Sequence, residues 1–164
     1  MKPVAIDAFD FGRMKEQREG ELAVAKLPRL ARECVESSGT LHWTLTGGTH
    51  DSGHQQLMLR VEGAVQLVCQ RCLKPFSFAI ASQSVLVLVQ DEAQADQVEA
   101  MLDDDSIDVI VGAKAMDVIE LIEDEALLAI PQAPKHAQCV EQIAGKEDIV
   151  VKPSPFAVLK DIRH

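Results

Sequence analysis

The chain has 164 residues, of which 47% are hydrophobic, and a formal net charge of −10 at pH 7. This length allows a single domain with its own core. No apolar run reaches the roughly eighteen residues of a spanning helix, and the opening stretch MKPVAIDAFDFGR lacks the apolar region of a secretory signal. We therefore expect a cytoplasmic protein with no membrane segment, whose four cysteines are reduced thiols or metal ligands.

The negative charge is concentrated in one part of the chain. Residues 91–125 contain thirteen acidic residues and a single base, Lys114, whereas the other 129 residues carry thirteen acids and fifteen bases. The net charge therefore describes one segment and not the whole surface, and it excludes neither RNA nor protein as a partner. An acidic face of this kind attracts basic partners and repels phosphate.

The first part of the chain predicts an arm, a helix and a strand. Residues 1–19 are mixed in character and are expected to form a partly ordered N-terminal arm. Apolar residues recur at helical spacing and predict a helix near residues 27–36. Alternating apolar and polar residues then predict a half-buried strand near residues 41–47.

The most regular pattern is an apolar alternation that predicts one long strand over residues 57–69. Gly63 keeps the phase of this alternation, and we interpret it as a bend or bulge inside the strand. A second long strand, over residues 76–90, follows a tight turn. Its last part is apolar on both parities, which fits either burial on both faces or a bulge near Ser82.

The second half of the chain predicts two helices separated by a short strand. Residues 91–106 are acidic and rich in alanine, which is typical of an exposed helix followed by a loop. A short strand is expected near residues 107–110. Asp117 is a candidate N-cap for a helix over residues 118–130. Apolar residues at helical spacing within residues 153–164 predict a C-terminal tail that docks on the domain or, alternatively, on a partner.

Three motifs in a fixed order resemble a known family. They are V-Q-L-V-C-Q-R-C-L-K-P-F at residues 65–76, E-D-E-A-L-L-A-I-P at residues 123–131, which Cys139 follows, and P-S-P-F-A-V-L-K at residues 153–160. Together they are similar to the YceD family of bacteria and chloroplasts, and the resemblance extends roughly over residues 20–159. Members of that family are implicated in the accumulation of large-subunit ribosomal RNA. The resemblance implies a role in ribosome biogenesis and supplies no catalytic residues.

From these elements we predict an α+β fold, in which an antiparallel sheet is built on the long β-hairpin and helices pack on one face. Residues 20–164 are expected to form a single YceD-like domain with the C-terminal docking tail. The resemblance implies a non-enzymatic factor for large-subunit (23S) ribosomal RNA. A hydrolase is disfavoured because the chain has no nucleophile elbow, phosphate loop or metal–carboxylate cluster.

The cysteines at the hairpin turn predict a zinc site. Cys69 and Cys72 have the Cys-x-x-Cys spacing that places two thiolates on one turn, and His136 with Cys139 offers a second pair of suitable ligands. The long separation between the pairs makes spacing alone an incomplete argument. Two alternatives stay open: the thiols pack at the end of the sheet with Cys139 incidental, or the first pair is a redox pair.

Basic residues near the same turn predict a contact with RNA phosphate, and the alternative is that they are ordinary solvated cations. These residues are Arg71 and Lys74 at the turn and Lys26, Arg29 and Arg32 near the predicted first helix. No aromatic residues are interleaved with them, so sequence-specific reading of single strands is not expected. The partner is therefore either large-subunit RNA or a precursor particle bound by these cations, or a basic ribosomal or assembly protein bound by residues 91–125. The acidic segment favours the protein partner.

Overall fold

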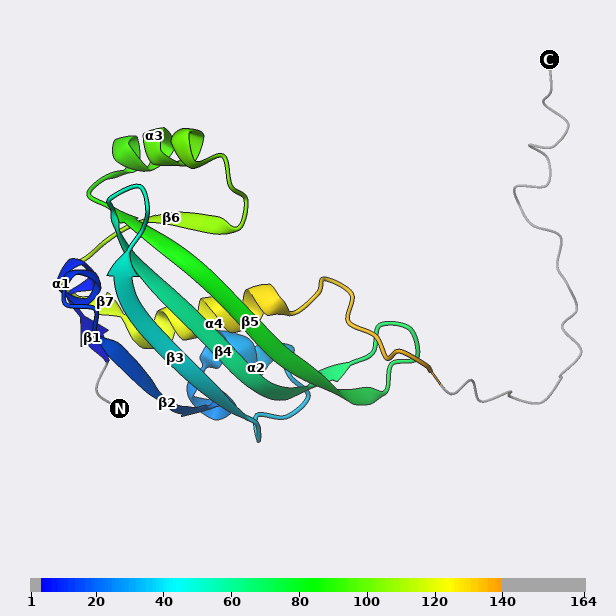
Figure 1. Cartoon of the computed structure of the whole chain (residues 1–164). Coiled ribbons are helices and arrows are strands. Elements are labelled where there is room, and N and C mark those ends of the chain that lie inside the picture. Colours follow the sequence, from blue (N-terminus) through cyan, green and yellow to red (C-terminus); the bar gives the residue numbers. More distant parts are fainter. Residues whose placement is uncertain (1–3, 140–164) are drawn as a thin grey trace, which may run out of the picture.

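The computed structural model describes residues 4–139. Its centre is a five-stranded sheet with the order β2-β3-β4-β5-β6, in which only the β5–β6 pair is parallel. The five strands are β2 (Gln17–Ala23), β3 (Thr40–Thr49), β4 (Gln55–Val68), β5 (Pro75–Val89) and β6 (Ile107–Val111). Figure 1 shows β3, β4 and β5 as long neighbouring ribbons. The α+β class and the long hairpin predicted from the sequence are confirmed.

The helices lie on both sides of this sheet. They are α1 (Ala8–Arg13), the 3₁₀ turn η1 (Val24–Lys26), α2 (Pro28–Glu33), α3 (Glu92–Leu102) and α4 (Val118–Ala129). A separate pair, β1 (Ala5–Ile6) and β7 (Met116–Asp117), joins the start of the chain to the start of α4. Asp117 is the N-cap of α4, as predicted, because its carboxylate accepts a hydrogen bond from the backbone N–H of Ile119 at 2.8 Å. None of the helices within residues 4–139 has the length and apolar character needed to cross a bilayer.

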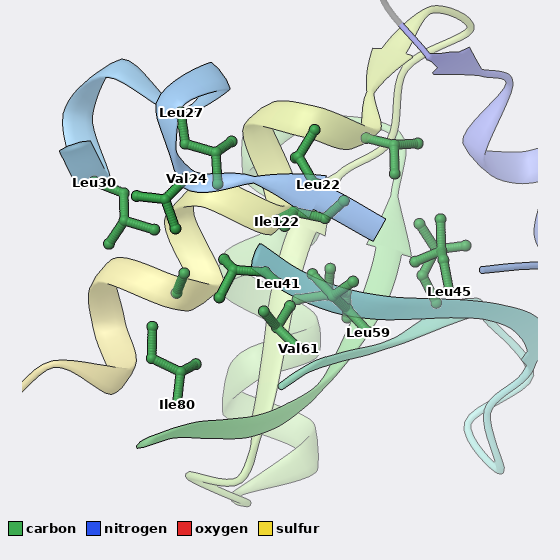
Figure 2. Close-up of a cluster of buried hydrophobic side chains, with 14 of the residues drawn as sticks. Leu22, Val24, Leu27, Leu30, Leu41, Leu45, Leu59, Val61, Ile80 and Ile122 are labelled. Carbon is green, nitrogen blue, oxygen red and sulfur yellow. The ribbon is translucent and has the colours of Figure 1, made fainter. Parts of the chain in front are cut away.

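The main core lies between the sheet and the face formed by α2 and α4. Figure 2 shows this cluster, to which Leu22 of β2, Leu41 of β3, Leu59 of β4, Ile80 of β5 and Ile122 of α4 all belong. These side chains are at most 5% exposed. Burial of each large aliphatic side chain stabilises the fold by about 1.5–3 kcal/mol before conformational entropy is counted. The two predicted helices that cover one face are therefore α2 and α4.

The strand alternation predicted the hairpin well, because Leu57, Leu59, Val61, Val65 and Leu67 share one parity of β4 and are all buried. The pairing of β4 with β5 runs from Gln56 opposite Val87 to Val68 opposite Pro75 without a break. A bulge at Gly63 was therefore the wrong interpretation. A Cβ atom there would lie 2.6 Å from the carbonyl oxygen of Thr40, so the glycine allows the close approach of β3.

The end of β5 is buried on both faces, which decides between the two alternatives for its apolar run. Leu86 and Leu88 belong to the main core, whereas Val87 and Val89 belong to a second cluster with α3. The register passes through Ser82 without a bulge. Since β5 and β6 are parallel, they need a crossover connection, and α3 supplies it.

The structure differs from the prediction at the first helix, which ends three residues earlier than expected. The backbone N–H of Val35 donates to the carbonyl oxygen of Gln66 at 2.8 Å, and Glu36 forms an isolated bridge with the same residue. This pairing with β4 takes the chain out of the helix after Glu33. Cys34 is half-buried and lies outside the cysteine cluster described below.

The start of the chain is part of the packed structure. Residues 5–19 form β1, α1 and the first part of β2, and the Phe11 side chain of α1 is 2% exposed within the core. The division of the chain at residue 20 stays a prediction. The tail predicted over residues 153–164 lies outside the described residues.

We expect Gly47→Ala to destabilise the protein by about 2 kcal/mol, because an added methyl group forces α1 away from β3. A Cβ atom at Gly47 would clash with the carbonyl oxygen of Phe11. Gly48 is the matched control, since the nearest atom to its Cβ would be 3.5 Å away. Urea unfolding of both variants measures the difference. Equal losses of stability would mean that the contact with α1 is not the cause.

Candidate metal centre

The turn between β4 and β5 is held by its own backbone. The N–H of Cys69 donates to the carbonyl oxygen of Lys74 at 2.9 Å, and the N–H of Leu73 donates to the carbonyl oxygen of Cys69 at 2.8 Å. Leu73 has a φ of 60°, in the left-handed region that reverses the chain direction. This local geometry presents Cys69 and Cys72 within one turn, as their spacing predicted.

The chain that follows α4 returns to this turn. The N–H of Gln70 donates to the carbonyl oxygen of Pro134 at 2.8 Å, and the guanidinium of Arg71 donates to the carbonyl oxygen of His136 at 3.3 Å. The ring of His136 also contacts Phe76, with 4.8 Å between ring centroids. Figure 1 shows this segment passing the tip of the β4–β5 hairpin. Residues 134–139 are thus placed beside the turn.

The four predicted ligands meet at this point. The sulfur atoms of Cys69 and Cys139 are 3.6 Å apart, and the Nδ1 atom of His136 is 3.4 Å from the sulfur of Cys72 and 3.7 Å from that of Cys139. All four candidate ligand atoms lie within 4.8 Å of one another. Tetrahedral zinc requires about 3.8 Å between two sulfurs and about 3.5 Å between sulfur and nitrogen, given its usual bond lengths. The cluster can therefore hold a metal ion, and its Cys₃His composition favours zinc.

The electrostatics of the Cys69 and Cys139 thiols also favour a cation between them. Burial raises the pKa of Cys69, but backbone N–H groups of Cys72, His136 and Arg71 stabilise its thiolate, and the pKa falls to about 5. Burial raises the pKa of Cys139 to about 11, and its hydrogen bonds with the sulfurs of Cys69 and Cys72 act in the same direction. Adjacent sulfurs cannot all be thiolates without a positive charge between them. A metal ion at the centre would supply that charge.

The five cations predicted to bind RNA occupy two places. Arg71 and Lys74 are exposed at the hairpin tip, and Lys26 and Arg32 are exposed on η1 and α2. Arg29 forms ion pairs with Glu123 at 2.9 Å and with Asp124 at 2.6 Å, so acidic groups of α4 balance its charge. A role of these residues in RNA binding stays a prediction.

The sequence profile described as "Large ribosomal RNA subunit accumulation protein YceD" matches residues 57–163, which is more than half of the chain. The chain belongs to the YceD family. The match confirms the resemblance predicted from the three motifs, and it includes all four residues of the cysteine and histidine cluster. The family is named for the accumulation of large-subunit ribosomal RNA and not for a catalytic activity.

The sequence of a curated YceD protein aligns with nearly the full chain. It is the large ribosomal RNA subunit accumulation protein YceD of Haemophilus influenzae, which is 26% identical over 170 aligned positions. The alignment covers 99% of this chain and 96% of the relative. No solved structure matches the chain significantly.

Two buried acids of α4 were not predicted from the sequence. Glu123 is 5% exposed and accepts hydrogen bonds from the backbone of α2, and Glu125 is 6% exposed and accepts hydrogen bonds from the hydroxyl groups of Ser82 and Ser84. In the sequence they are two of the thirteen acids of residues 91–125 and look like the rest. The signal that could have identified them is their position next to the apolar stripe of the helix.

Proposed function

We propose that this protein is a non-enzymatic factor that supports the accumulation of large-subunit (23S) ribosomal RNA in the cytoplasm. It acts by binding a component of the assembling subunit, which is a basic ribosomal or assembly protein or the precursor RNA. The observation that carries the proposal is the family match over residues 57–163. The name of the Haemophilus influenzae relative supports the same role.

The cysteine and histidine cluster fits a structural metal site better than a catalytic one. Structural zinc sites are closed by protein ligands, whereas catalytic sites keep a position open for water or substrate. The cluster offers Cys69, Cys72, His136 and Cys139, which would fill a tetrahedral site completely. When bound, zinc supplies a rigid link between the hairpin tip and residues 134–139. The backbone hydrogen bond from Gln70 to Pro134 orients that link.

The proposed function is tested by deleting the gene and measuring the amounts of the two ribosomal RNAs. We expect the ratio of large-subunit to small-subunit RNA to fall, and the wild-type protein supplied in trans to restore it. Precursor species measured in the same cells distinguish slow maturation from degradation. An unchanged ratio under fast growth would overturn the proposal.

A second candidate is that the hairpin tip itself contacts RNA, and the exposure of Arg71 and Lys74 beside the metal centre favours it. We expect the double change Arg71→Glu with Lys74→Glu to weaken binding of a large-subunit precursor RNA. The slope of log affinity against log salt should fall by about 2, one for each lost phosphate contact. Lys15→Glu with Lys114→Glu makes the same change in charge at exposed sites elsewhere. Equal weakening by both pairs would exclude a contact at the tip.

A further inference from the structure

A groove lies between α4, the edge strand β6 and the C-terminal end of α3. Its volume is about 560 Å³, and Leu59 of β4 and Leu86 of β5 are among the residues that line it. The lining has only two kinds of side chain. Besides the buried Glu125, six acids line it: Glu99, Asp103, Asp104, Asp105, Asp108 and Asp124. The other lining residues are all leucine, isoleucine or valine.

The fold holds these acids at the edge of the sheet. The helix α3 ends at Leu102, and its C-cap Asp103 has a left-handed φ of 45° and donates its N–H to the carbonyl oxygen of Glu99 at 3.2 Å. Asp104 then accepts a hydrogen bond from the N–H of Ser106 at 2.9 Å, and β6 begins at the next residue. Within residues 4–139, β6 is the last strand of the sheet and pairs with β5 alone, so the turn before it lies at an edge of the described sheet.

Most of this negative charge has no cation beside it within residues 4–139. Among the six acids around the groove, only Asp124 forms an ion pair in that part of the chain, with Arg29. The apolar part is also accessible, because Leu128 of α4 lines the groove and is 80% exposed. Repulsion among neighbouring carboxylates and exposed aliphatic surface are both relieved by one kind of ligand, which carries positive charges and apolar side chains together.

We propose that this groove binds a segment rich in lysine and arginine, with aliphatic side chains between the cations, of a protein that itself binds large-subunit RNA. The inference rests on the proposed function and names the partner and its site. A protein segment that binds RNA through its phosphates is typically cationic, because RNA carries a negative charge at every nucleotide. The groove presents carboxylates to such a segment in place of phosphates, and the same carboxylates repel RNA.

The test uses the full-length, metal-loaded protein and fluorescently labelled synthetic peptides. A peptide in which lysine alternates with leucine is expected to bind, and its affinity should fall as salt is raised. A peptide of glutamate and leucine should not bind, because its charge is repelled. A peptide of lysine and serine should bind at least fivefold more weakly, because it lacks the apolar contacts. Equal affinity for all three peptides would overturn the proposal.

Matched variants locate the binding. Asp105→Asn with Asp108→Asn is expected to weaken binding of the lysine–leucine peptide about tenfold. Asp51→Asn with Asp96→Asn removes the same charge from exposed sites outside the groove and should have less than a twofold effect.

A second pair tests the apolar contact. Leu128→Ser should weaken binding, whereas Met101→Ser should not, although both side chains are 80% exposed and only Leu128 lines the groove. Equal effects within either matched pair would overturn the proposal.

Two further outcomes would assign the groove to another occupant. If a labelled oligoribonucleotide displaces the peptide and is itself weakened by the Asp105 and Asp108 changes, the ligand is RNA. The double variant Lys160→Glu with Arg163→Glu tests the chain's own C-terminal segment. If this variant shifts the NMR methyl signals of Leu121 and Ile110, and the peptide shifts the same signals in the unchanged protein, the occupant is that segment. If the peptide does not bind but deletion of the gene still lowers the ribosomal RNA ratio, only this inference is overturned. A normal RNA ratio after deletion overturns the proposed function.

Discussion

A Cys69→Ser variant is expected to lose its zinc and to release residues 134–139 from the hairpin tip. The sulfur of Cys69 is completely buried and lies 3.6 Å from that of Cys139, so no water can replace it without opening the turn. A serine hydroxyl does not ionise at neutral pH and is a poor zinc ligand. We expect about one equivalent of zinc in the dialysed wild-type protein and less than about a tenth of an equivalent in the variant.

The loss of structure should be local, because the apolar core stops before the turn. Leu67 is in the main core and Phe76 packs against it, but the residues between them contribute nothing to that cluster. A region with few apolar contacts depends on its cross-links for order. Hydrogen exchange of the backbone amides should therefore accelerate at Gln70 and through residues 135–139, while the amides of β3 and β4 keep their protection.

Cys34→Ser is the control for this experiment, since Cys34 is a half-buried cysteine outside the cluster. It should keep its zinc and its protection at the turn. The metal hypothesis itself is overturned if the wild-type protein carries less than about a tenth of an equivalent of zinc and its folding is unchanged by a chelator. In that case the thiols simply pack at the end of the sheet.

The sequence predicted the hairpin and one half of the candidate metal centre directly, because both depend on local patterns. Alternation along residues 57–69 is a property of a single strand, and the Cys-x-x-Cys pair needs only one turn. The other half, His136 and Cys139, was predicted from ligand type and spacing alone. Its place depends on where the chain goes after α4. The hydrogen bond between Gln70 and Pro134 lies on that path, and no periodic pattern in the sequence predicts it.

The groove could not be predicted because it depends on strand pairing. The apolar residues near 107–110 indicate a strand, but periodicity does not say that β6 pairs in parallel with β5 and becomes the edge of the sheet. The count of acids in residues 91–125 likewise does not say where each acid lies in the fold. Two of those acids, Glu123 and Glu125, are buried, while Asp103, Asp104 and Asp105 lie around the groove.

A Glu123→Ala variant is expected to lose about 3 kcal/mol of stability, because this carboxylate caps another helix. The helix α2 has no side-chain cap of its own. One oxygen of Glu123 accepts the backbone N–H groups of Arg29 at 2.6 Å and Leu30 at 3.1 Å, and the other accepts the Arg29 guanidinium at 2.9 Å. Alanine leaves two backbone donors without a partner, and each buried unsatisfied donor costs about 1–3 kcal/mol. The midpoint of thermal unfolding should fall by roughly 10 °C.

Two control variants separate helix capping from the ion pair. Glu120→Ala changes an exposed acid of the same helix and should alter stability by less than about 0.5 kcal/mol. Arg29→Ala removes the guanidinium but keeps the acceptor for both backbone N–H groups. Because the guanidinium is partly exposed and its ion pairs are screened by water, this change should cost much less stability than Glu123→Ala. If Arg29→Ala instead destabilises the protein as much as Glu123→Ala does, the ion pair and not the cap holds α2 against α4. The basic residue predicted from the sequence to bind RNA would then be chiefly a structural partner of the acidic helix.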